Sequence, residues 1–545
     1  MVDVNVKAFE IETRTRHGDL VRADVYLPLG ARGRLPVLFA ASPYQKELRR
    51  LPPSANFPFI EYGPIQLYLD HGYAYVAMDV PGTGRSEGAW DPVSRAEGEA
   101  IHDMIEHVAG LDWSNGRIGM IGMSYYCWSQ WNAARTRPPH LVTIGAFDGA
   151  TDMYRDWMYH GGIPAYGFLN SWLFGSVLLQ HMANGKPVAG NGRGDVVYDI
   201  YSHPFDDDWQ RRRSPFWELD KIDIPVLSIG SWGKASLHLR GNFLGFERVR
   251  GPKQLLVVGA KTFAETLMLY FDEAFHREEL LPWYDHHLKG VRNGVMDRPP
   301  VRYFVKGASR IESASSWPPA DVAIAEFHLS GARSGHERSL NDGSLVEAAA
   351  SEDGGTTSWN YPDPLWMAGV TTFNEKGLPD HTARVVTFTT APFDTEREFT
   401  GQGVIHLFAS SDQTDLDVMV KLSVVEDGTP PIKVTQGWLR ASHRAEDPEF
   451  TTEMRPFHSH AFAEPIEPGQ VYELRVELLP MSVRVFPGQR LRLEISNWES
   501  AITEAPMTHW YGQKHGTDTY HHNATHPSRL RLHERQRPST RKGEK

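Results

Sequence analysis

Six short apolar runs in the first half of the chain constrain its fold more than any other feature. Each run is almost continuously hydrophobic, which is typical of strands buried on both faces of a parallel sheet. Helical stretches separate several of the runs, and this alternation predicts an α/β domain. A hairpin of two β-rich runs, turning near Gly18, precedes them. The six runs are residues 36–42, 73–80, 117–123, 141–148, 224–230 and 253–260.

Two later changes of pattern divide the chain further. Residues 151–215 contain long apolar and aromatic stretches without strand candidates, which predicts a helical cap inserted at the carboxyl edge of the sheet. Beyond about residue 310 the pattern changes to short alternating strands separated by Gly, Pro and Asp, which indicates an antiparallel sandwich or jelly roll. The predicted domains are a core of residues 1–150 and 216–308, a cap of 151–215 and a β domain of 309–545.

Composition and charge exclude several classes of protein. Hydrophobic side chains make up 41% of the 545 residues and charged ones 23%, as in globular proteins. The net charge of −12 disfavours nucleic acid and anionic membranes, so we expect a small-molecule substrate and leave a homodimer open. The single cysteine, Cys127, allows no internal disulfide, and the N-terminal sequence has no signal-peptide pattern. We expect a soluble cytoplasmic protein.

The segment RIGMIGMSYYCWSQW contains the candidate nucleophile. It places Ser124 between a predicted strand and a predicted helix, the context of a nucleophile elbow. The backbone N–H of Tyr125, at the start of the helix, would stabilise a developing oxyanion. The usual elbow pattern is G-x-S-x-G, and Tyr126 stands here in place of the second glycine. The alternative is that Ser124 only caps the helix.

Several other segments extend this pattern. They are the loop Ser42-Pro43-Tyr44, the loop DVPGTGRSEG at 79–88, WYDHHLKG at 283–290 and GWLRASHR at 437–444. Together with Gly122-Met123-Ser124-Tyr125 they resemble the cocaine esterase and X-Pro dipeptidyl-peptidase family of serine hydrolases. The resemblance implies an α/β-hydrolase core, a helical cap and a C-terminal jelly roll, without metal or organic cofactor. It also implies that the Tyr44 hydroxyl is the second oxyanion donor.

The chain departs from this family at the other two triad positions. Lys234 stands where the resemblance implies the aspartate, and Phe263, or Thr262 with a shift of one residue, stands where it implies the histidine. A serine hydroxyl still needs a base, and triads are defined by geometry more than by sequence position. A rewired triad would take His238 or His160 as its base and Asp148 as its acid. Each of these residues also has an ordinary structural interpretation, as a helix cap or a packed polar side chain.

A second interpretation uses the lysines. Lys234 or Lys261 would serve as the base if burial lowered its pKa, or the two would form a cationic pocket floor for an anion. Trp157, Trp172 and Trp232 are the aromatic side chains that we expect to line the substrate pocket, although aromatic residues at helical spacing often only pack. The histidine clusters lack carboxylates at ligand spacing, so we expect no metal site.

The sequence therefore favours a serine hydrolase that cleaves an ester, lactone or amide bond of a small acyl substrate. Ser124 would form the acyl-enzyme, with Tyr44 and Tyr125 at the oxyanion and His238 with Asp148 as base and acid. The alternative is a relative that has lost hydrolysis and uses the pocket for binding or for lyase-like or isomerase-like chemistry. The vacated triad positions favour that alternative.

Overall fold

The computed structural model divides the chain into two compact units. The first combines Met1–Met158 with Leu169–Arg302, and the second combines Tyr159–Phe168 with Tyr303–Lys545. The described residues are 6–46, 61–178, 196–350, 355–361, 363, 372–373, 379–380, 382–497, 499, 509 and 515–536. The basic segment of residues 537–545 lies outside the described residues. Over the described part of the chain, no helix is long and apolar enough to cross a membrane.

The first unit is built on the predicted parallel sheet. Strands pair in the order β1-β2-β4-β3-β5-β6-β9-β10, and all neighbours from β4 to β10 run parallel. The antiparallel hairpin of β1 and β2 precedes them at the edge, as the turn near Gly18 predicted. The strands are β1 (Val6–Arg14), β2 (Leu20–Pro28), β3 (Leu35–Ser42), β4 (Ala74–Asp79), β5 (Ser114–Met123), β6 (Leu141–Phe147), β9 (Val226–Ser231) and β10 (Lys253–Val258).

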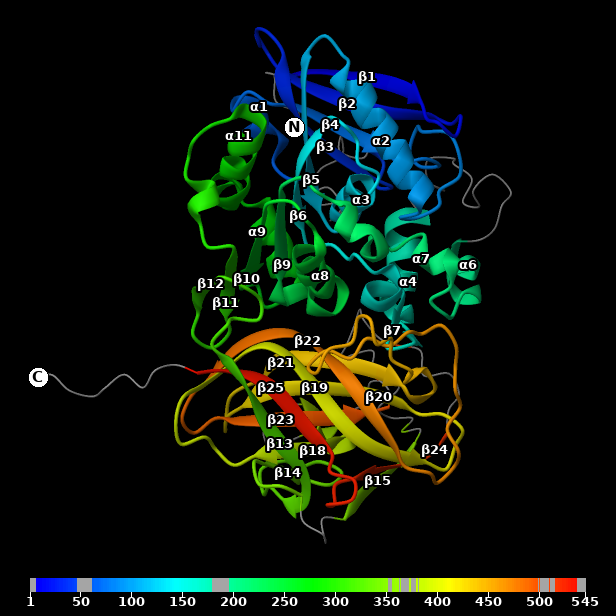
Figure 1. The fold of residues 1–545 in the computed structure, drawn as a ribbon, viewed down its shortest axis with the longest axis vertical. Coiled ribbons are helices and arrows are strands. Elements are labelled where there is room, and N and C mark those ends of the chain that lie inside the picture. Colours follow the sequence, from blue (N-terminus) through cyan, green and yellow to red (C-terminus); the bar gives the residue numbers. More distant parts are fainter. Residues whose placement is uncertain are drawn as a thin grey trace, which may run out of the picture. The chain divides into compact units, whose positions relative to one another are not determined.

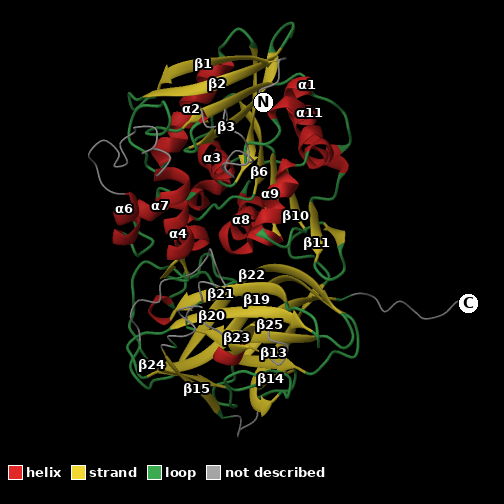
Figure 2. Cartoon of the chain, turned by 180° about the vertical axis from the view of Figure 1, so that it is seen from behind, coloured by secondary structure: helices red, strands yellow, loops and turns green. Residues whose placement is uncertain are grey.

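Helices cover both faces of this sheet, which confirms the predicted α/β fold (Figure 1). Helices α2 (Arg95–Ala109) and α3 (Tyr125–Ala134) lie on one face, and α1 (Ile65–Asp70) and α11 (Leu281–Lys289) lie on the other (Figure 2). Helices α8 (Arg240–Arg248), α9 (Phe263–Phe271) and α10 (Glu273–Phe275) complete the set after β9 and β10. Because β5, β6, β9 and β10 are parallel, the turns that follow them meet at one edge of the sheet.

The segment between β6 and β9 is mostly helical, with one feature that the sequence did not indicate. A short hairpin of β7 (Tyr159–His160) and β8 (Ile163–Pro164) turns through Gly161 and Gly162, and it belongs to the second unit. The helices of the segment are α4 (Tyr166–Ser171), α6 (Val196–Ser202) and α7 (Asp208–Arg211), with π-helical turns at Tyr154–Met158 and Trp172–Leu178.

From Tyr303 on, the second unit is rich in strands, which Figure 2 draws in yellow. Within the described residues, eleven strands form one sheet, in the order β15-β24-β19-β25-β13-β14-β18-β23-β20-β21, with β22 also paired to β19. Its inward side chains form a continuous apolar core of aliphatic and aromatic residues. The strands are β13 (Val322–Arg333), β14 (Gly343–Val346), β15 (Thr356–Tyr361), β18 (Val386–Thr390), β19 (Arg397–Ser411), β20 (Asp417–Val425), β21 (Ile432–Arg440), β22 (Tyr472–Val485), β23 (Arg490–Ser496), β24 (Gly516–His521) and β25 (Arg529–Arg535).

Candidate active site

Ser124 lies in a sharp turn between β5 and α3. Its backbone has φ 61° and ψ −120°, a conformation that residues with a Cβ rarely adopt. The turn is held from the neighbouring strand, because the Ser124 N–H donates to the carbonyl oxygens of Phe147 at 3.2 Å and Asp148 at 3.0 Å. Strain of this kind concentrates at functional sites. The predicted strand-turn-helix elbow is therefore present, and it aims the hydroxyl at the carboxyl edge of the sheet.

Tyr126 fits this elbow because Gly122 makes room for it. Gly122 has φ +132°, and a Cβ added there would lie 2.2 Å from the Cβ of Tyr126. The bare Cα of Gly122 thus lets the first turn of α3 pass close to the end of β5. The departure from G-x-S-x-G at Tyr126 leaves the elbow geometry intact.

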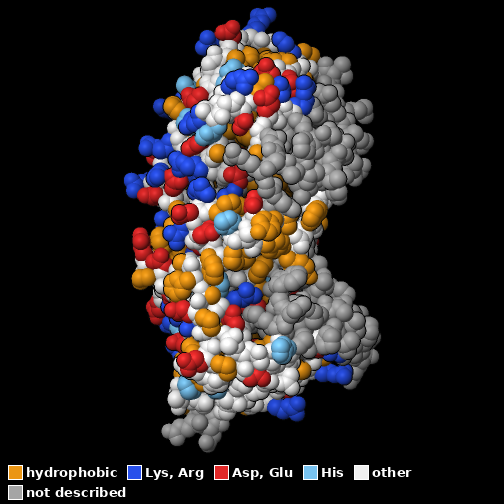
Figure 3. Space-filling model, turned by 90° about the vertical axis from the view of Figure 1, so that its right-hand side faces the viewer, with side chains coloured by type: hydrophobic (Ala, Val, Ile, Leu, Met, Phe, Trp, Pro, Cys, Tyr) orange, Lys and Arg blue, Asp and Glu red, His pale blue; other side chains and the backbone are white. Residues whose placement is uncertain are grey.

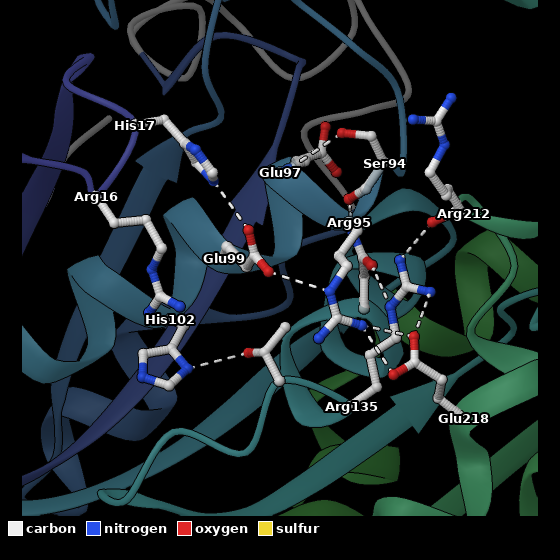
Figure 4. Close-up of polar contacts among 12 residues, drawn as sticks. Arg16, His17, Ser94, Arg95, Glu97, Glu99, His102, Arg135, Arg212 and Glu218 are labelled. Carbon is white, nitrogen blue, oxygen red and sulfur yellow. Dashed lines mark hydrogen bonds and ion pairs between the residues drawn. The ribbon is translucent and has the colours of Figure 1, made fainter. Parts of the chain in front are cut away.

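A polar network fixes helix α3 against helix α2 and its surroundings (Figure 4). The Ser94 hydroxyl caps α2 by accepting the N–H of Glu97 at 3.1 Å. Arg95 of α2 and Arg135 at the end of α3 share the carboxylate of Glu218, at 2.6 Å and 3.5 Å. Several contacts of this network are buried or part-buried, so the helix that carries the elbow has a fixed position.

The first residue of α3 is held by its own hydroxyl. The Tyr125 O–H donates to Glu97 Oε2 at 2.7 Å, and burial raises the pKa of the Glu97 carboxyl to about 8. The backbone N–H of Tyr125 belongs to the first turn of the helix, whose N–H groups have no acceptor within the helix. It is therefore placed to donate to an anion next to Ser124.

Tyr44 follows β3 and supplies a second donor beside the elbow. Its hydroxyl oxygen accepts the indole N–H of Trp172 at 2.9 Å, so its own hydrogen is directed elsewhere. Burial raises the pKa of Tyr44 well above its usual value, with Glu61 adding to the effect and the nearby Ser124 hydroxyl opposing it. Tyr44 therefore keeps its proton, and its O–H can donate to an oxyanion formed at Ser124.

His238 is the histidine that contacts the candidate nucleophile. It lies in a π-helical turn (Ala235–Leu239), and its Nε2 is 3.2 Å from Ser124 Oγ. Its Nδ1 accepts the indole N–H of Trp128 at 3.2 Å. An indole nitrogen can only donate, so Nδ1 carries no hydrogen and the neutral ring carries its hydrogen on Nε2. His238 therefore donates a hydrogen bond to Ser124 Oγ.

The surroundings of His238 also oppose a positive charge on its ring. Burial lowers the pKa of His238 well below its usual value, and the charge of Lys234 lowers it further. Among the described residues, no carboxylate forms a hydrogen bond with this ring. In particular, Asp148 does not bond to it. The pairing of His238 with Asp148 as base and acid is therefore not formed in this structure.

Glu61 is a buried carboxylate beside the elbow that the sequence analysis did not identify. Its carbonyl oxygen accepts the N–H of Met123 at 2.8 Å, which holds it next to Ser124. Burial raises the pKa of its carboxyl to about 7, although Lys234 and the Ser124 hydroxyl both lower it. Neither carboxylate oxygen has a hydrogen-bond partner of ordinary geometry among the described residues. No sequence pattern marks Glu61, because only the folded chain brings it to the end of β5.

Lys234 and Phe263 occupy the two vacated family positions, and they contact each other. The Lys234 ammonium lies 4.1 Å from the centre of the Phe263 ring, a cation–π arrangement. Its Nζ is 3.8 Å from Glu61 Oε1, and both side chains are buried. Burial lowers the pKa of Lys234, while Glu61 and Asp148 raise it. The structure thus replaces an acid and a histidine with a buried cation and an aromatic ring.

Asp148 is the second buried carboxylate near Lys234. It follows β6 with φ 51°, and its Oδ1 accepts the N–H of Ser231 at 2.9 Å. Burial raises the pKa of its carboxyl to about 7, and Lys234 opposes this rise. Despite these acidic groups, no set of three or more His, Cys, Asp or Glu side chains in the described ranges is arranged to hold a metal ion.

Aromatic side chains surround Ser124 and His238. Trp128, which bonds to His238, packs on Trp157 with ring centres 4.8 Å apart, and Trp157 packs on Trp172 at 5.2 Å. The structure therefore brings Trp157 and Trp172 next to the elbow, and their role as pocket residues stays a prediction. Trp232 is also buried, and its ring centre lies 6.4 Å from that of Phe243.

Two other predicted site residues have different surroundings. Lys261 is exposed, and its backbone N–H donates to Glu265 at 2.8 Å, so of the two lysines only Lys234 is buried. His160 belongs to the second unit, where its ring stacks on Trp438 and its Nδ1 lies 2.8 Å from His509 Nε2. These contacts account for the burial of His160 within that unit.

Comparison with known proteins agrees with this layout. Residues 17–261 match the X-Pro dipeptidyl-peptidase S15 family, and residues 293–531 match the X-Pro dipeptidyl-peptidase C-terminal non-catalytic domain. Cocaine esterase from Rhodococcus sp. (strain MB1 Bresler) is 26% identical over 552 residues, which cover 91% of this chain and 92% of the esterase.

Solved structures show the same fold over almost the whole chain. A CocE/NonD family hydrolase from Staphylococcus aureus superposes with a TM-score of 0.82 at 23% identity, covering 97% of this chain and 94% of that one. An aminopeptidase from a marine sediment archaeon, Thaumarchaeota archaeon, superposes with a TM-score of 0.75 at 17% identity. The superposition covers 98% of this chain and 97% of the aminopeptidase. The α/β-hydrolase core followed by a β-rich domain is thus a known architecture.

Proposed function

The chain belongs to the cocaine esterase and X-Pro dipeptidyl-peptidase family of serine hydrolases, and we propose that it cleaves an ester, lactone or amide bond through an acyl-enzyme on Ser124. The observation that carries this proposal is the positive-φ elbow of Ser124, with the Tyr44 hydroxyl beside it. An elbow of this kind is the usual support of a serine nucleophile in α/β-hydrolases.

The oxyanion of the tetrahedral intermediate would be held by two donors. One is the Tyr44 O–H, which the Trp172 indole orients, and the other is the Tyr125 N–H at the start of α3. Donors fixed before the reaction, in a site that excludes water, stabilise the charge that develops in the transition state. The burial of Tyr44 and Tyr125 supports this role.

The acyl group of the substrate would be small and largely apolar. Trp157 and Trp172 are almost completely buried, and their rings pack against Trp128 and Tyr125 beside the elbow. The net charge of −12 favours a small-molecule partner over a polyanion. On the molecular face drawn in Figure 3, basic and acidic side chains are interspersed, which agrees with this choice. We propose hydrolysis without an organic cofactor, by a site whose usual acid and base are replaced.

Labelling with a fluorophosphonate probe tests the nucleophile directly. The wild-type protein should acquire one probe per chain, and a peptide mass map should locate it on Ser124. Ser124→Ala should label at least about 10³-fold more slowly while keeping its thermal unfolding curve, because the attacking atom is gone. Folded wild-type protein that does not label, or equal labelling of Ser124→Ala, would contradict the proposal.

A further inference from the structure

We propose that Glu61 is the general base of this site, taking the proton of the Ser124 hydroxyl, and that His238 serves only as a hydrogen-bond donor to Ser124 Oγ. This inference rests on the proposed hydrolytic function of Ser124. It assigns the missing base to a residue outside the positions that the family resemblance implies.

The hydrogen bonds of His238 exclude it as the base in the observed arrangement. The Trp128 indole donates to Nδ1, so the ring hydrogen is on Nε2, the atom that faces Ser124 Oγ at 3.2 Å. A base must present a lone pair to the hydroxyl, as the histidine of a serine triad does once a carboxylate holds its Nδ1–H. In His238 the roles of the two ring nitrogens are the opposite of those in a triad, because Nδ1 accepts a hydrogen bond and Nε2 donates one.

An imidazolium at His238 would also lack compensation. In a serine triad a buried carboxylate stabilises the imidazolium that forms when the serine gives up its proton. The charged group that acts on His238 is instead the ammonium of Lys234, which has the same sign as an imidazolium. Proton transfer to His238 would therefore place two positive charges in one buried site.

Glu61 has the properties that His238 lacks. Its side chain is completely buried, and its backbone carbonyl is bonded to Met123, the residue before the nucleophile. Neither carboxylate oxygen has a hydrogen-bond partner of ordinary geometry among the described residues, and Lys234 approaches Oε1 only as an ion pair at 3.8 Å, so lone pairs remain available for the hydroxyl proton. Its pKa of about 7 suits a base that accepts and returns a proton near neutral pH.

Lys234 then acts as a positioning residue for this base. Its ammonium lies 3.8 Å from Glu61 Oε1 and favours the ionised form of the carboxyl. The Phe263 ring, whose centre lies 4.1 Å from the ammonium, stabilises the cation without competing for the carboxylate. The lysine and phenylalanine at the vacated positions thus support a carboxylate base.

The proton balance of the reaction closes on these groups. The Ser124 proton moves to Glu61 as Oγ attacks the carbonyl carbon, and the carbonyl π electrons move to the oxygen bound by Tyr44 and Tyr125. When the intermediate collapses, the leaving oxygen or nitrogen takes the proton from Glu61. Water then attacks the acyl group and gives a proton to Glu61. Oγ leaves the second intermediate with that proton, which regenerates the free serine.

The test compares four variants by fluorophosphonate labelling rate and by kcat/KM for a p-nitrophenyl ester from pH 5 to 9. In Glu61→Gln both rates should fall by about 10²- to 10³-fold, the usual contribution of a general base. The fall of kcat/KM at acidic pH, which has its midpoint near pH 7 in the wild type, should disappear. In His238→Gln, which keeps an N–H donor, the loss of rate should be at least tenfold smaller than in Glu61→Gln, and the fall of kcat/KM at acidic pH should remain. Asp148→Asn should also keep this fall, and the exposed Glu278→Gln should match the wild type.

The outcomes are separable. If Glu61→Gln keeps the rate and the fall of kcat/KM at acidic pH while His238→Gln loses both, the assignment of the base is wrong and Ser124 remains the nucleophile. If the wild type does not label at Ser124 at all, the proposed function itself fails. Should Glu61→Gln not fold, the double variant Glu61→Gln with Lys234→Met removes the uncompensated buried cation and takes its place in the comparison.

Discussion

The turn after β5 and the turns after β9 and β10 meet at the same edge of the sheet, yet they differ in how far they depart from the family pattern. After β5, Ser124 keeps the strained backbone of a nucleophile elbow. After β9 and β10, Lys234 and Phe263 replace the acid and the histidine that the resemblance implies, and they form a cation–π pair at 4.1 Å. The elbow is retained, whereas a cation replaces the anion that the resemblance implies at the acid position.

This difference explains why the remaining polar groups of the site are arranged as they are. A buried ammonium is costly unless carboxylates compensate it, and Glu61 and Asp148 both act on Lys234. The Ser124 hydroxyl also lowers the pKa of the Glu61 carboxyl. The lysine at the acid position thus has as its partner a buried carboxylate from another part of the chain.

The largest expected effect comes from restoring the family pair in a protein that lacks Glu61. The triple variant combines Glu61→Gln with Lys234→Asp and Phe263→His. It should react with the fluorophosphonate probe at least about 100-fold faster than Glu61→Gln alone. The new aspartate and histidine would supply a second route for the proton. Labelling kinetics measure the gain.

The matched control for this restoration omits the new histidine. Glu61→Gln with Lys234→Asp alone should stay as slow as Glu61→Gln, because it contains no added base. A folded triple variant that labels no faster would mean that the turns after β9 and β10 have also moved out of reach of Ser124.

Much of the first unit was predictable because its signals are local. The strands follow from continuous apolar runs, and Ser124 follows from a strand, a sharp turn and a helix in one short segment. His238 was found because it lies one helical turn beyond Lys234. Its hydrogen bond to Trp128 was not predictable, because Trp128 comes from α3 and meets His238 only in the folded chain.

The site residues that sequence reasoning missed or mispaired depend on contacts between distant segments. Glu61 reaches the nucleophile through a backbone bond to Met123, and nothing in its neighbouring sequence indicates that bond. Asp148 was expected to serve His238 because it ends the next strand, but its Oδ1 is bonded to Ser231. Parallel strand ends indicate which turns meet, whereas side-chain partners depend on the packing of those turns.

The second prediction concerns the oxyanion donor on the retained side of the site. Tyr44→Phe should lower kcat by about 10²-fold and change KM less than about threefold, because the hydroxyl would bond more strongly to the transition state than to the substrate. Steady-state kinetics with the p-nitrophenyl ester measure both constants. Tyr198→Phe, at a tyrosine that is 69% exposed, is the matched control. An unchanged kcat would remove Tyr44 from the oxyanion site.

The third prediction concerns the cation that replaced the acid. Lys234→Met removes an influence that lowers the pKa of Glu61, so that pKa should rise above about 7. The carboxyl would stay protonated to higher pH, and the acidic limb of kcat/KM should move upward, with a loss of about tenfold at neutral pH. Lys261→Met, at the exposed lysine, should leave the midpoint in place. A downward shift would contradict the charge coupling between Lys234 and Glu61.

The smallest expected effect comes from Trp128→Phe, which removes the indole N–H that fixes the His238 tautomer. The His238 ring could then carry its hydrogen on either nitrogen. With Glu61 as the base this choice matters little, and kcat/KM should change less than about threefold because Phe keeps most of the packing. The pH midpoint should stay near 7. The measurement distinguishes two roles of His238, since a ring that acted as the base would become more effective once Nδ1 could carry the hydrogen. A rise of kcat/KM by tenfold or more would therefore indicate that the Trp128 indole keeps His238 from acting as the base. In that case the residues that replace the acid and the histidine after β9 and β10 would not have ended base catalysis by a histidine.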